Sequence, residues 1–284
     1  MSTQIFTDLP IDDYHASDFV SNSKLQTFLR RGPRAYWMRY VHKSLPKEDT
    51  QALRAGSAFD TLLFDGEQVF RERFVERPAG MKFTTKAGKA WKKEQDEAGL
   101  VVIEPEDARA FEWMCAAIRE HELANDLLHA CDTQVSLRGA MDGLPGIQAR
   151  PDGLCLQGCA ASDFAPYVLD LKTTAELDQL TSGKSVVRYC YHQQMAFSQQ
   201  LLRAHGIPEL RYYLLAVEKT GAHRAQVIEL TQDYVDLGER QITHGLQRLA
   251  AHYRTNTWPR VTEDVVVLEP PPWMNKEASA PEAA

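Results

Sequence analysis

No stretch of the sequence holds the roughly 18 consecutive apolar residues that a membrane-spanning helix requires. The opening segment, Met1–Asp8, lacks the basic start and apolar run of a secretory signal peptide. The chain has five cysteines: Cys115, Cys131, Cys155, Cys159 and Cys190. Their odd number and scattered spacing argue against a disulfide framework and against a zinc or iron–sulfur site. We therefore expect a cytoplasmic protein with reduced thiols and no membrane association.

The sequence also lacks internal repeats and the metal motifs H-E-x-x-H and H-x-x-E-H. What it has is length and apolar content, with 284 residues of which 44% are hydrophobic. A chain of this size buries a substantial core as one large domain, or as one domain with an appendage.

The net charge of −7 argues at first against a nucleic-acid binder, but the charge is unevenly distributed. Residues 21–100 carry 16 Lys and Arg against 10 Asp and Glu, and the remainder carries 16 against 29. The basic part is able to contact phosphates while the acidic part maintains solubility. Solvated helices carry such charges too, so the asymmetry is only suggestive.

Apolar periodicity predicts helices, concentrated in the first half, at 21–31, 33–40, 52–64, 85–98, 104–121, 189–205 and 233–253. Alternating or short apolar runs predict strands at 133–138, 146–155, 165–172, 211–218 and 224–230. Residues 1–20 show no regular pattern. The order predicts an α/β (α+β) fold with a central mixed sheet flanked by helices. We expect a helical part over 1–131, a sheet-bearing core over 132–273 and a disordered tail over 274–284, forming one domain overall.

Two carboxylates and a lysine stand out within the predicted strands. Asp152 follows Pro151, and Asp170 and Lys172 are two residues apart, so both leave the same face of a strand. Converging carboxylates suit Mg²⁺, which polarises a phosphodiester and activates water. Lys172 is then expected to neutralise developing charge, or to activate water with a pKa lowered by burial. The competing interpretation is a turn residue at Asp152 and a surface ion pair between the other two.

These residues resemble a known family. Ala149–Leu154 and Val168–Thr174 are similar to the core of the PD-(D/E)XK nucleases, most of all the RecE-like (exonuclease VIII-type) branch, which is related to lambda exonuclease and the RecB nuclease domain. The likeness covers most of residues 14–273, with further matching segments in the same order at Ser21–Leu25, Pro33–Tyr36, Ala55–Leu63, Tyr191–Phe197 and Val217–Lys219. The resemblance implies a restriction-endonuclease-like core.

The resemblance implies roles for individual residues. Asp152, Asp170 and the main-chain carbonyl of Leu171 are expected to bind Mg²⁺, for which Mn²⁺ can substitute. Lys172 is the expected catalytic lysine, and Gln194 is expected on a helix that lines the site. The chain departs from the family at three positions: Asp60 replaces a metal-binding histidine, Gln134 replaces a glutamate, and Ser198 replaces a tyrosine. A carboxylate at residue 60 remains a competent hard ligand.

The basic stretch is a candidate DNA-binding segment with Lys82, Lys86, Lys89 and Lys93. The last three share one helical face, where ammonium groups can track a phosphate backbone without reading bases. The family has a similar Thr-Lys-x-Gly-Lys segment. A merely solvated helix face is the alternative. Arg30 and Arg34 are weaker candidates of the same kind.

The expected function is that of a Mg²⁺-dependent exonuclease acting on double-stranded DNA ends. The resemblance implies resection from the 5′ end, a single-strand annealing protein as partner, and a ring-shaped homo-oligomer. Two alternatives stay open. One is an endonuclease or repair nuclease of the same superfamily. The other is a DNA-binding protein in which the changes at Asp60 and Gln134 have removed catalysis.

Overall fold

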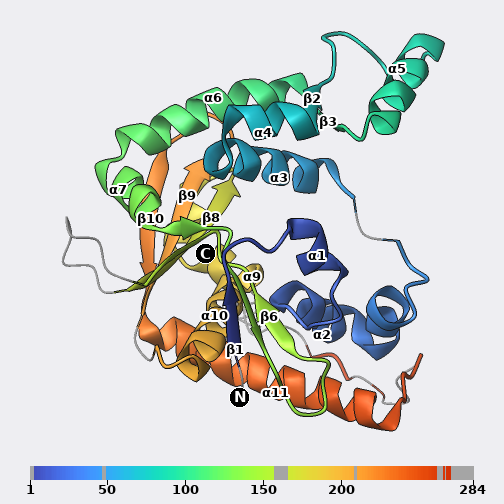
Figure 1. The fold of residues 1–284 in the computed structure, drawn as a ribbon, viewed down its shortest axis with the longest axis vertical. Helices are drawn as coiled ribbons and strands as arrows, with labels where there is room; N and C mark the ends of the chain where they lie inside the picture. The colour runs from blue at the N-terminus through green and yellow to red at the C-terminus, as the bar shows by residue number, and fades with distance from the viewer. Residues whose placement is uncertain are drawn as a thin grey trace, which may run out of the picture.

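The computed structural model describes residues 3–46, 49–156, 166–207, 210–260, 265 and 267–269. In these ranges a five-stranded sheet lies between two groups of helices, and one helix projects away from the body (Figure 1). This arrangement confirms the predicted mixed sheet flanked by helices. No helix in the described ranges is both long and apolar enough to span a bilayer.

The central sheet has the strand order β10-β9-β8-β7-β4. Its strands are β10 (Ala225–Leu230), β9 (Arg211–Glu218), β8 (Tyr167–Thr174), β7 (Gly153–Cys155) and β4 (Asp132–Thr133). β8 and β9 pair in parallel, whereas the other neighbours are antiparallel. Most residues of β8 and β9 are buried, as expected for near-continuous apolar strands covered on both faces.

Alternate residues of these strands enter two separate apolar clusters. Val168 and Leu214 join the cluster on one face, and Leu169 and Leu215 join the cluster on the other. The helices of the first face are α2 (Asn22–Tyr36), α8 (Leu177–Thr181), α9 (Lys184–Arg188), α10 (Tyr191–Ala204) and α11 (Gln232–Thr255). Those of the second face are α3 (Gln51–Phe64), α4 (Gly66–Arg73), α6 (Pro105–Glu120) and α7 (Glu122–Ala130).

Smaller elements complete the fold. A second sheet has the order β1-β5-β6, with β1 (Thr3–Phe6), β5 (Ser136–Gly139) and β6 (Ile147–Ala149). β2 (Phe74–Glu76) and β3 (Val101–Ile103) form a parallel pair at the base of the projecting helix α5 (Lys86–Glu97). The remaining elements are α1 (Ile11–Ala16) and the π-helical turn η1 (Trp37–Val41).

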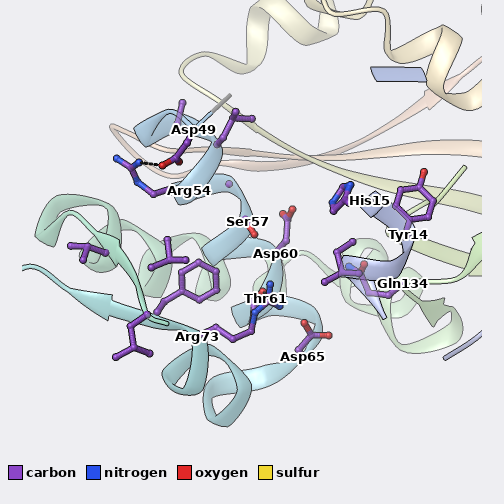
Figure 2. A pocket seen from close by; sticks show the side chains of 18 of the residues that line it. Tyr14, His15, Asp49, Arg54, Ser57, Asp60, Thr61, Asp65, Arg73 and Gln134 are labelled. Carbon is purple, nitrogen blue, oxygen red and sulfur yellow. Dashed lines mark hydrogen bonds and ion pairs between the residues drawn. The ribbon is translucent and has the colours of Figure 1, made fainter. Parts of the chain in front are cut away.

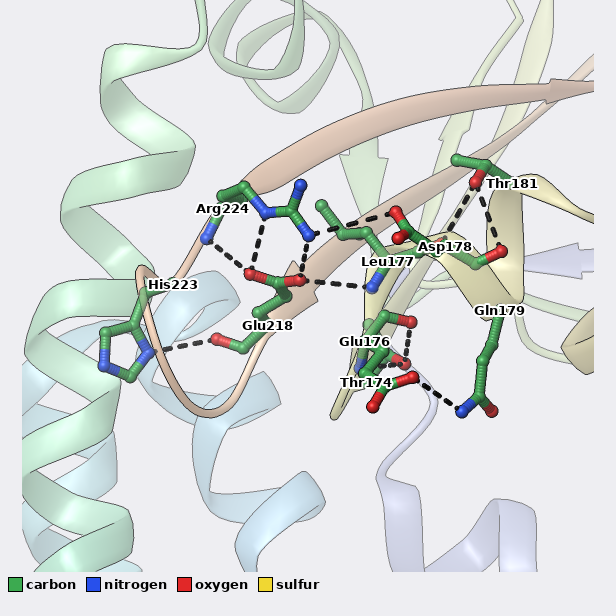
Figure 3. Close-up of polar contacts among 9 residues, drawn as sticks. All are labelled: Thr174, Glu176, Leu177, Asp178, Gln179, Thr181, Glu218, His223 and Arg224. Atoms are coloured by element: carbon green, nitrogen blue, oxygen red, sulfur yellow. Dashed lines mark hydrogen bonds and ion pairs between the residues drawn. The ribbon is translucent and has the colours of Figure 1, made fainter.

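The loop between β9 and β10 holds α8 against the sheet (Figure 3). Glu218 accepts a 3.2 Å hydrogen bond from the backbone N–H of Leu177, the first residue of α8. Its carboxylate also accepts two bonds from the Arg224 guanidinium, at 2.7 and 3.1 Å. These bonds give the buried carboxylate a full set of donors.

Several predicted elements need correction. The segment 1–20 is not irregular where the structure describes it, because it forms β1 and α1. The predicted strands 133–138 and 146–155 are each divided into two strands that belong to different sheets. The first breaks near Gln134, whose backbone is left-handed (φ 57°), and the second at Arg150–Asp152, where Pro151 cannot donate a ladder bond.

The two helices predicted at 21–31 and 33–40 meet where expected. Both lie within α2 as far as Tyr36, but Gly32 has φ 83° and ψ 171°, so the chain bends at Gly32–Pro33, and Trp37–Val41 is a π-helical turn rather than a continuation of the α-helix. Periodicity did not reveal α4, α8 and α9, which have five to eight residues each. Segments this short give too few turns for a helical repeat to emerge.

The predicted division into a helical part (1–131) and a sheet-bearing core (132–273) stays a prediction. Residues 3–131 are mainly helical in the described ranges, but they also supply β1, which pairs with β5. Both apolar clusters draw residues from each side of the boundary, for example Phe28 with Leu214 and Phe59 with Leu215. The expected tail, 274–284, lies outside the described residues.

Candidate active site

Strand β8 delivers Asp170 and Lys172 to the same side of the sheet, as their spacing predicts. Asp170 is 1% exposed, and its Oδ2 forms an ion pair with Lys172 Nζ. Lys172 lies beside Ala216 of β9 in the strand register. The small alanine side chain leaves room for the lysine stem over the sheet. The pair is therefore buried at the site, and the alternative of a surface ion pair is wrong.

Asp152 reaches β8 because β7 is short. The β7–β8 ladder ends at the Gly153–Leu169 pair, which leaves the next N–H on that edge of β8, that of Leu171, without a strand partner. Asp152 Oδ2 accepts this N–H at 2.7 Å. The carboxylate thereby takes the place of a neighbouring strand and is fixed by the backbone of the residue that follows Asp170.

Helix α10 contributes Gln194 from the first face of the sheet. Its Nε2 donates a 2.6 Å hydrogen bond to Asp170 Oδ1, and its Oε1 accepts from Lys172 Nζ at 3.3 Å. The amide thus bridges both partners of the ion pair. This placement agrees with the predicted helix lining the site.

Asp60 approaches from α3, on the other group of helices, and its carboxylate points into a cavity (Figure 2). The cavity has a volume of about 1000 Å³ and reaches Asp152. Burial raises the pKa of Asp60 to about 7; Lys172 opposes this shift, and Asp170 adds to it. Asp60 therefore lines the same cavity as Asp152, and its pKa responds to both residues of the ion pair.

The three carboxylates repel one another. The pKa of Asp152 is raised well above its usual value by burial, and further by Asp170 and Asp60. Burial also acts to lower the pKa of Lys172, but Asp170 and Asp152 outweigh it, so that pKa is raised. The predicted lowering of the lysine pKa is therefore wrong: in this arrangement Lys172 is a cation that holds crowded anions together.

The donor set fits a hard divalent cation. Asp170 Oδ2 is buried, and the partner it has among the described residues is the Lys172 ammonium, so its remaining lone pair is open to a cation. No three His, Cys, Asp or Glu side chains of the described chain form a ready-made metal cluster. Mg²⁺ needs no such cluster, because it commonly takes one or two protein carboxylates and keeps several waters. Asp152 and Asp170 are the residues able to hold it, and ligation by the Leu171 carbonyl and Asp60 stays a prediction.

The cavity runs from the carboxylates to the base of the projecting arm. Its walls come from α1, α3, β3 and α5, and include Phe83 and Lys92 on the arm side. Figure 2 shows Asp60, Asp65 and Gln134 around one end and Arg54 at another. The cavity therefore extends from Asp60 and Asp152 to the arm that carries the predicted DNA-binding lysines, although those lysines do not line it.

The predicted DNA-binding lysines are all exposed on or just before α5: Lys82, Lys86, Lys89 and Lys93. Thr85 caps the helix by accepting the N–H of Gly88 at 3.0 Å. Lys93 pairs with Glu97 at 3.4 Å, whereas Lys86 and Lys89 form no ion pair with any described residue. These two ammonium groups are consequently available for a phosphate backbone.

The two predicted arginines have partners within the protein. Arg30 Nη2 donates to the carbonyl of Arg188 at 2.7 Å and to Cys190 Sγ at 3.2 Å. The Arg34 guanidinium lies 4.2 Å from the centre of the Trp37 ring. Both are on the α2 side of the sheet rather than with α5, and their contact with DNA stays a prediction.

Two residues at the site were not predicted. Arg150 donates to Gln134 Oε1 at 3.1 Å, to Ser136 Oγ at 2.9 Å and to the carbonyl of Leu9 at 2.8 Å. Tyr191 lies against Lys172, with the lysine Nζ 4.7 Å from its ring centre. Arg150 could have been noticed because it lies two residues before Asp152, the candidate metal-binding carboxylate. Tyr191 begins the family-like segment Tyr191–Phe197, but that resemblance gave it no role.

The fold and the two carboxylates at β8 and before β7 are those of a PDDEXK-like domain. The chain belongs to the family described as "PDDEXK-like domain of unknown function (DUF3799)", which it matches over residues 21–269. It is similar in fold to the crystal structure of a "Putative exonuclease" from Eubacterium rectale, with a TM-score of 0.61 and 15% identity over 96% of this chain and 99% of that chain. No curated protein matches the chain. Membership of the PD-(D/E)XK group is thereby confirmed, and the RecE-like branch stays a prediction.

Proposed function

We propose that the chain is a Mg²⁺-dependent exodeoxyribonuclease that hydrolyses double-stranded DNA from its ends. The observation that carries the proposal is the convergence of Asp152, Asp170 and Lys172 on one buried point beside a large cavity. The name of the similar Eubacterium rectale protein favours attack at ends. Resection from the 5′ end, leaving 3′ single strands for recombination or repair, follows the RecE-like resemblance.

Each residue has a definite task in this proposal. Asp152 and Asp170 hold the cation, which when bound activates water and neutralises charge on the phosphate. With a raised pKa, Lys172 is protonated and suited to stabilise the negative charge that develops on the phosphate, rather than to act as a base. Gln194 fixes the lysine and Asp170 relative to each other.

The decisive experiment is digestion of end-labelled linear duplex DNA with Mg²⁺, with product lengths followed over time. We expect progressive shortening from the 5′ end by the wild-type protein and a loss of rate by orders of magnitude in Lys172→Ala. Closed circular plasmid serves as the control. Its linearisation would identify an endonuclease, and intact linear duplex that is nevertheless bound would identify a DNA-binding protein without catalysis.

Partners belong to the same proposal. A ring-shaped homo-oligomer would enclose duplex DNA and keep the enzyme on its substrate, and a single-strand annealing protein would receive the 3′ strand. Sedimentation of the purified chain, alone and with such a protein, tests both. Mn²⁺ is expected to replace Mg²⁺, because both are accommodated by oxygen ligands.

A further inference from the structure

A pair of tyrosines continues outward from Lys172. Tyr191 lies against Lys172 Nζ, and its ring stacks on Tyr189 with centres 5.8 Å apart and planes 26° apart. Tyr191 is half-buried, whereas Tyr189 is 50% exposed. The neighbouring Val187 is 55% exposed. Together Val187, Tyr189 and Tyr191 form an apolar ledge that starts at the site and ends in solvent.

The turn that carries the ledge is held in an unusual backbone conformation. Cys190, between the two tyrosines, is buried and left-handed (φ 59°, ψ 38°), which residues other than glycine rarely adopt. Arg30 fastens the turn by donating to the Arg188 carbonyl and to Cys190 Sγ. The turn thus holds these exposed side chains in a defined position. Backbone strain of this kind is typical of functional sites.

The chain segment that carries the ledge is basic. Between Asp178 and Tyr191 the sequence has no carboxylate but contains Lys184 and Arg188, although the whole chain has a net charge of −7. Arg188 also lies over the Tyr189 ring, with Cζ 5.6 Å from its centre. An aromatic face bordered by cations is the combination that binds single-stranded nucleic acid, because bases stack on the ring while phosphates meet the positive charge.

We propose that the Tyr189–Tyr191 ledge stacks the unpaired bases of the DNA strand whose phosphate lies at Lys172. The inference rests on the proposed nuclease function and adds the residues that separate and hold the strand end. Lys172 Nζ lies 4.7 Å from the centre of the Tyr191 ring, and that centre lies 5.8 Å from the centre of the Tyr189 ring. At roughly 3.4 Å per nucleotide, these two distances span at most about three nucleotides from the held phosphate, so the second nucleotide lies within reach of the ledge.

The test uses duplex DNA with 2-aminopurine at the second nucleotide from the 5′ end, or at the tenth as the internal reference. Ca²⁺ replaces Mg²⁺ so that DNA is bound without turnover. With the wild-type protein we expect a change in fluorescence at the second position and little at the tenth. Tyr189→Ala should abolish that change and raise the Kd about tenfold, since loss of one stacked base has roughly this effect. Tyr189→Phe should behave as wild type.

Trp113→Ala is the matched control, because Trp113 is a 65% exposed aromatic residue on α6, on the second face of the sheet. Trp113→Ala should leave both the fluorescence change and the Kd as they are in the wild type. The proposal is overturned if Tyr189→Ala and Trp113→Ala reduce the fluorescence change equally, or if Tyr189→Ala leaves it unaltered. Digestion of linear duplex is measured separately. If the wild type shows the fluorescence change at the second nucleotide but does not digest DNA, the ledge proposal holds and the proposed nuclease function is wrong. If the wild type digests DNA and Tyr189→Ala leaves fluorescence and KM unchanged, only the ledge proposal is wrong.

Discussion

Gln194 Nε2 donates a 2.6 Å hydrogen bond to Asp170 Oδ1, so a side chain from helix α10 fixes the buried carboxylate of strand β8. The same amide accepts from Lys172 Nζ. Because an amide has one donor end and one acceptor end, it can satisfy an anion and a cation at once in only one orientation. The relative position of Asp170 and Lys172 therefore depends on a residue 24 positions away from Asp170 in the sequence.

Replacing Gln194 tests this dependence. Gln194→Ala should lower kcat about 10- to 100-fold and change DNA affinity little, because the lysine loses its fixed geometry but keeps its charge. Gln194→Glu should be at least as damaging, since it places a like charge next to Asp170. Single-turnover digestion and anisotropy titrations measure the two effects. Gln179→Ala removes an exposed amide that donates to Glu176 and, among the described residues, to no other group, so it should be neutral. An unaffected kcat in Gln194→Ala would contradict the assigned role.

Neutralising Asp152 should have opposite effects on stability and on metal binding. Its raised pKa means that the ionised form is unfavourable in the folded, metal-free protein. Stability from this group therefore falls as pH rises above the unfolded-state value of about 4. Asp152→Asn should raise the melting temperature of the metal-free protein at pH 7 by a few degrees. It should also abolish the further rise that Mg²⁺ gives the wild type. Calorimetry with and without Mg²⁺ measures both; a lower melting temperature without metal would refute the repulsion.

Asp60 provides a test of metal preference. Asp60→His introduces the residue type that the RecE-like nucleases have at the matching position, and imidazole favours softer cations than a carboxylate does. We expect the ratio of Mn²⁺- to Mg²⁺-supported activity to increase several-fold. Asp60→Asn keeps an oxygen and should leave the ratio closer to that of the wild type. Equal ratios in all three proteins would show that residue 60 does not contact the cation.

The α5 lysines should determine part of the salt dependence. Lys86→Ala and Lys89→Ala should each reduce the slope of log affinity against log salt by about one unit, because each phosphate contact releases about one counterion. Lys93→Ala should have a smaller effect, since Lys93 already pairs with Glu97. Lys43→Asn, which removes a cation paired with Asp18 at 3.1 Å, is the control. An unchanged slope for Lys86 and Lys89 places the DNA elsewhere.

Glu218 should make folding sensitive to acid. The hydrogen bonds from Arg224 lower the pKa of Glu218 to about 2, and those from the backbone of Leu177 and Arg224 act in the same direction. The stabilisation is fully present above the unfolded-state pKa, about 4.3, and is lost as pH falls towards 2. Glu218→Gln should therefore destabilise the protein by about 1–3 kcal/mol at pH 7 and by little near pH 2. Urea unfolding at the two pH values measures the difference; an equal loss at both would exclude the ion pair as its origin.

The sequence was most predictive where local periodicity and chemistry coincide. The i, i+2 spacing of Asp170 and Lys172 fixes their common face on any strand, and the structure confirms it. Long elements such as α11 and β9 follow from their apolar repeats. Local pattern does not contain the pairing of strands, so the division of 146–155 between two sheets was not predicted.

The pKa values of the site residues were less predictable from the sequence than the positions of these residues. Burial alone lowers the pKa of Lys172, and the opposite result arises from Asp152 and Asp170, whose proximity depends on the tertiary fold. The contact of Tyr191 with Lys172 was not predicted for the same reason. An aromatic residue at the start of a helix is ordinary in sequence, and only the packing of α10 on the sheet brings it against the lysine.

The segment Arg150–Asp152, between β6 and β7, links the site to both sheets. On one side of this segment, β6 belongs to the small sheet and is linked to the first residues through Arg150 and Leu9; on the other, β7 belongs to the large sheet. Asp152 lies at this junction, where its carboxylate accepts the Leu171 N–H. Movement of the small sheet relative to β7 is therefore expected to displace Asp152 from Asp170, which makes the geometry of the cation site depend on a sheet that supplies none of its carboxylates.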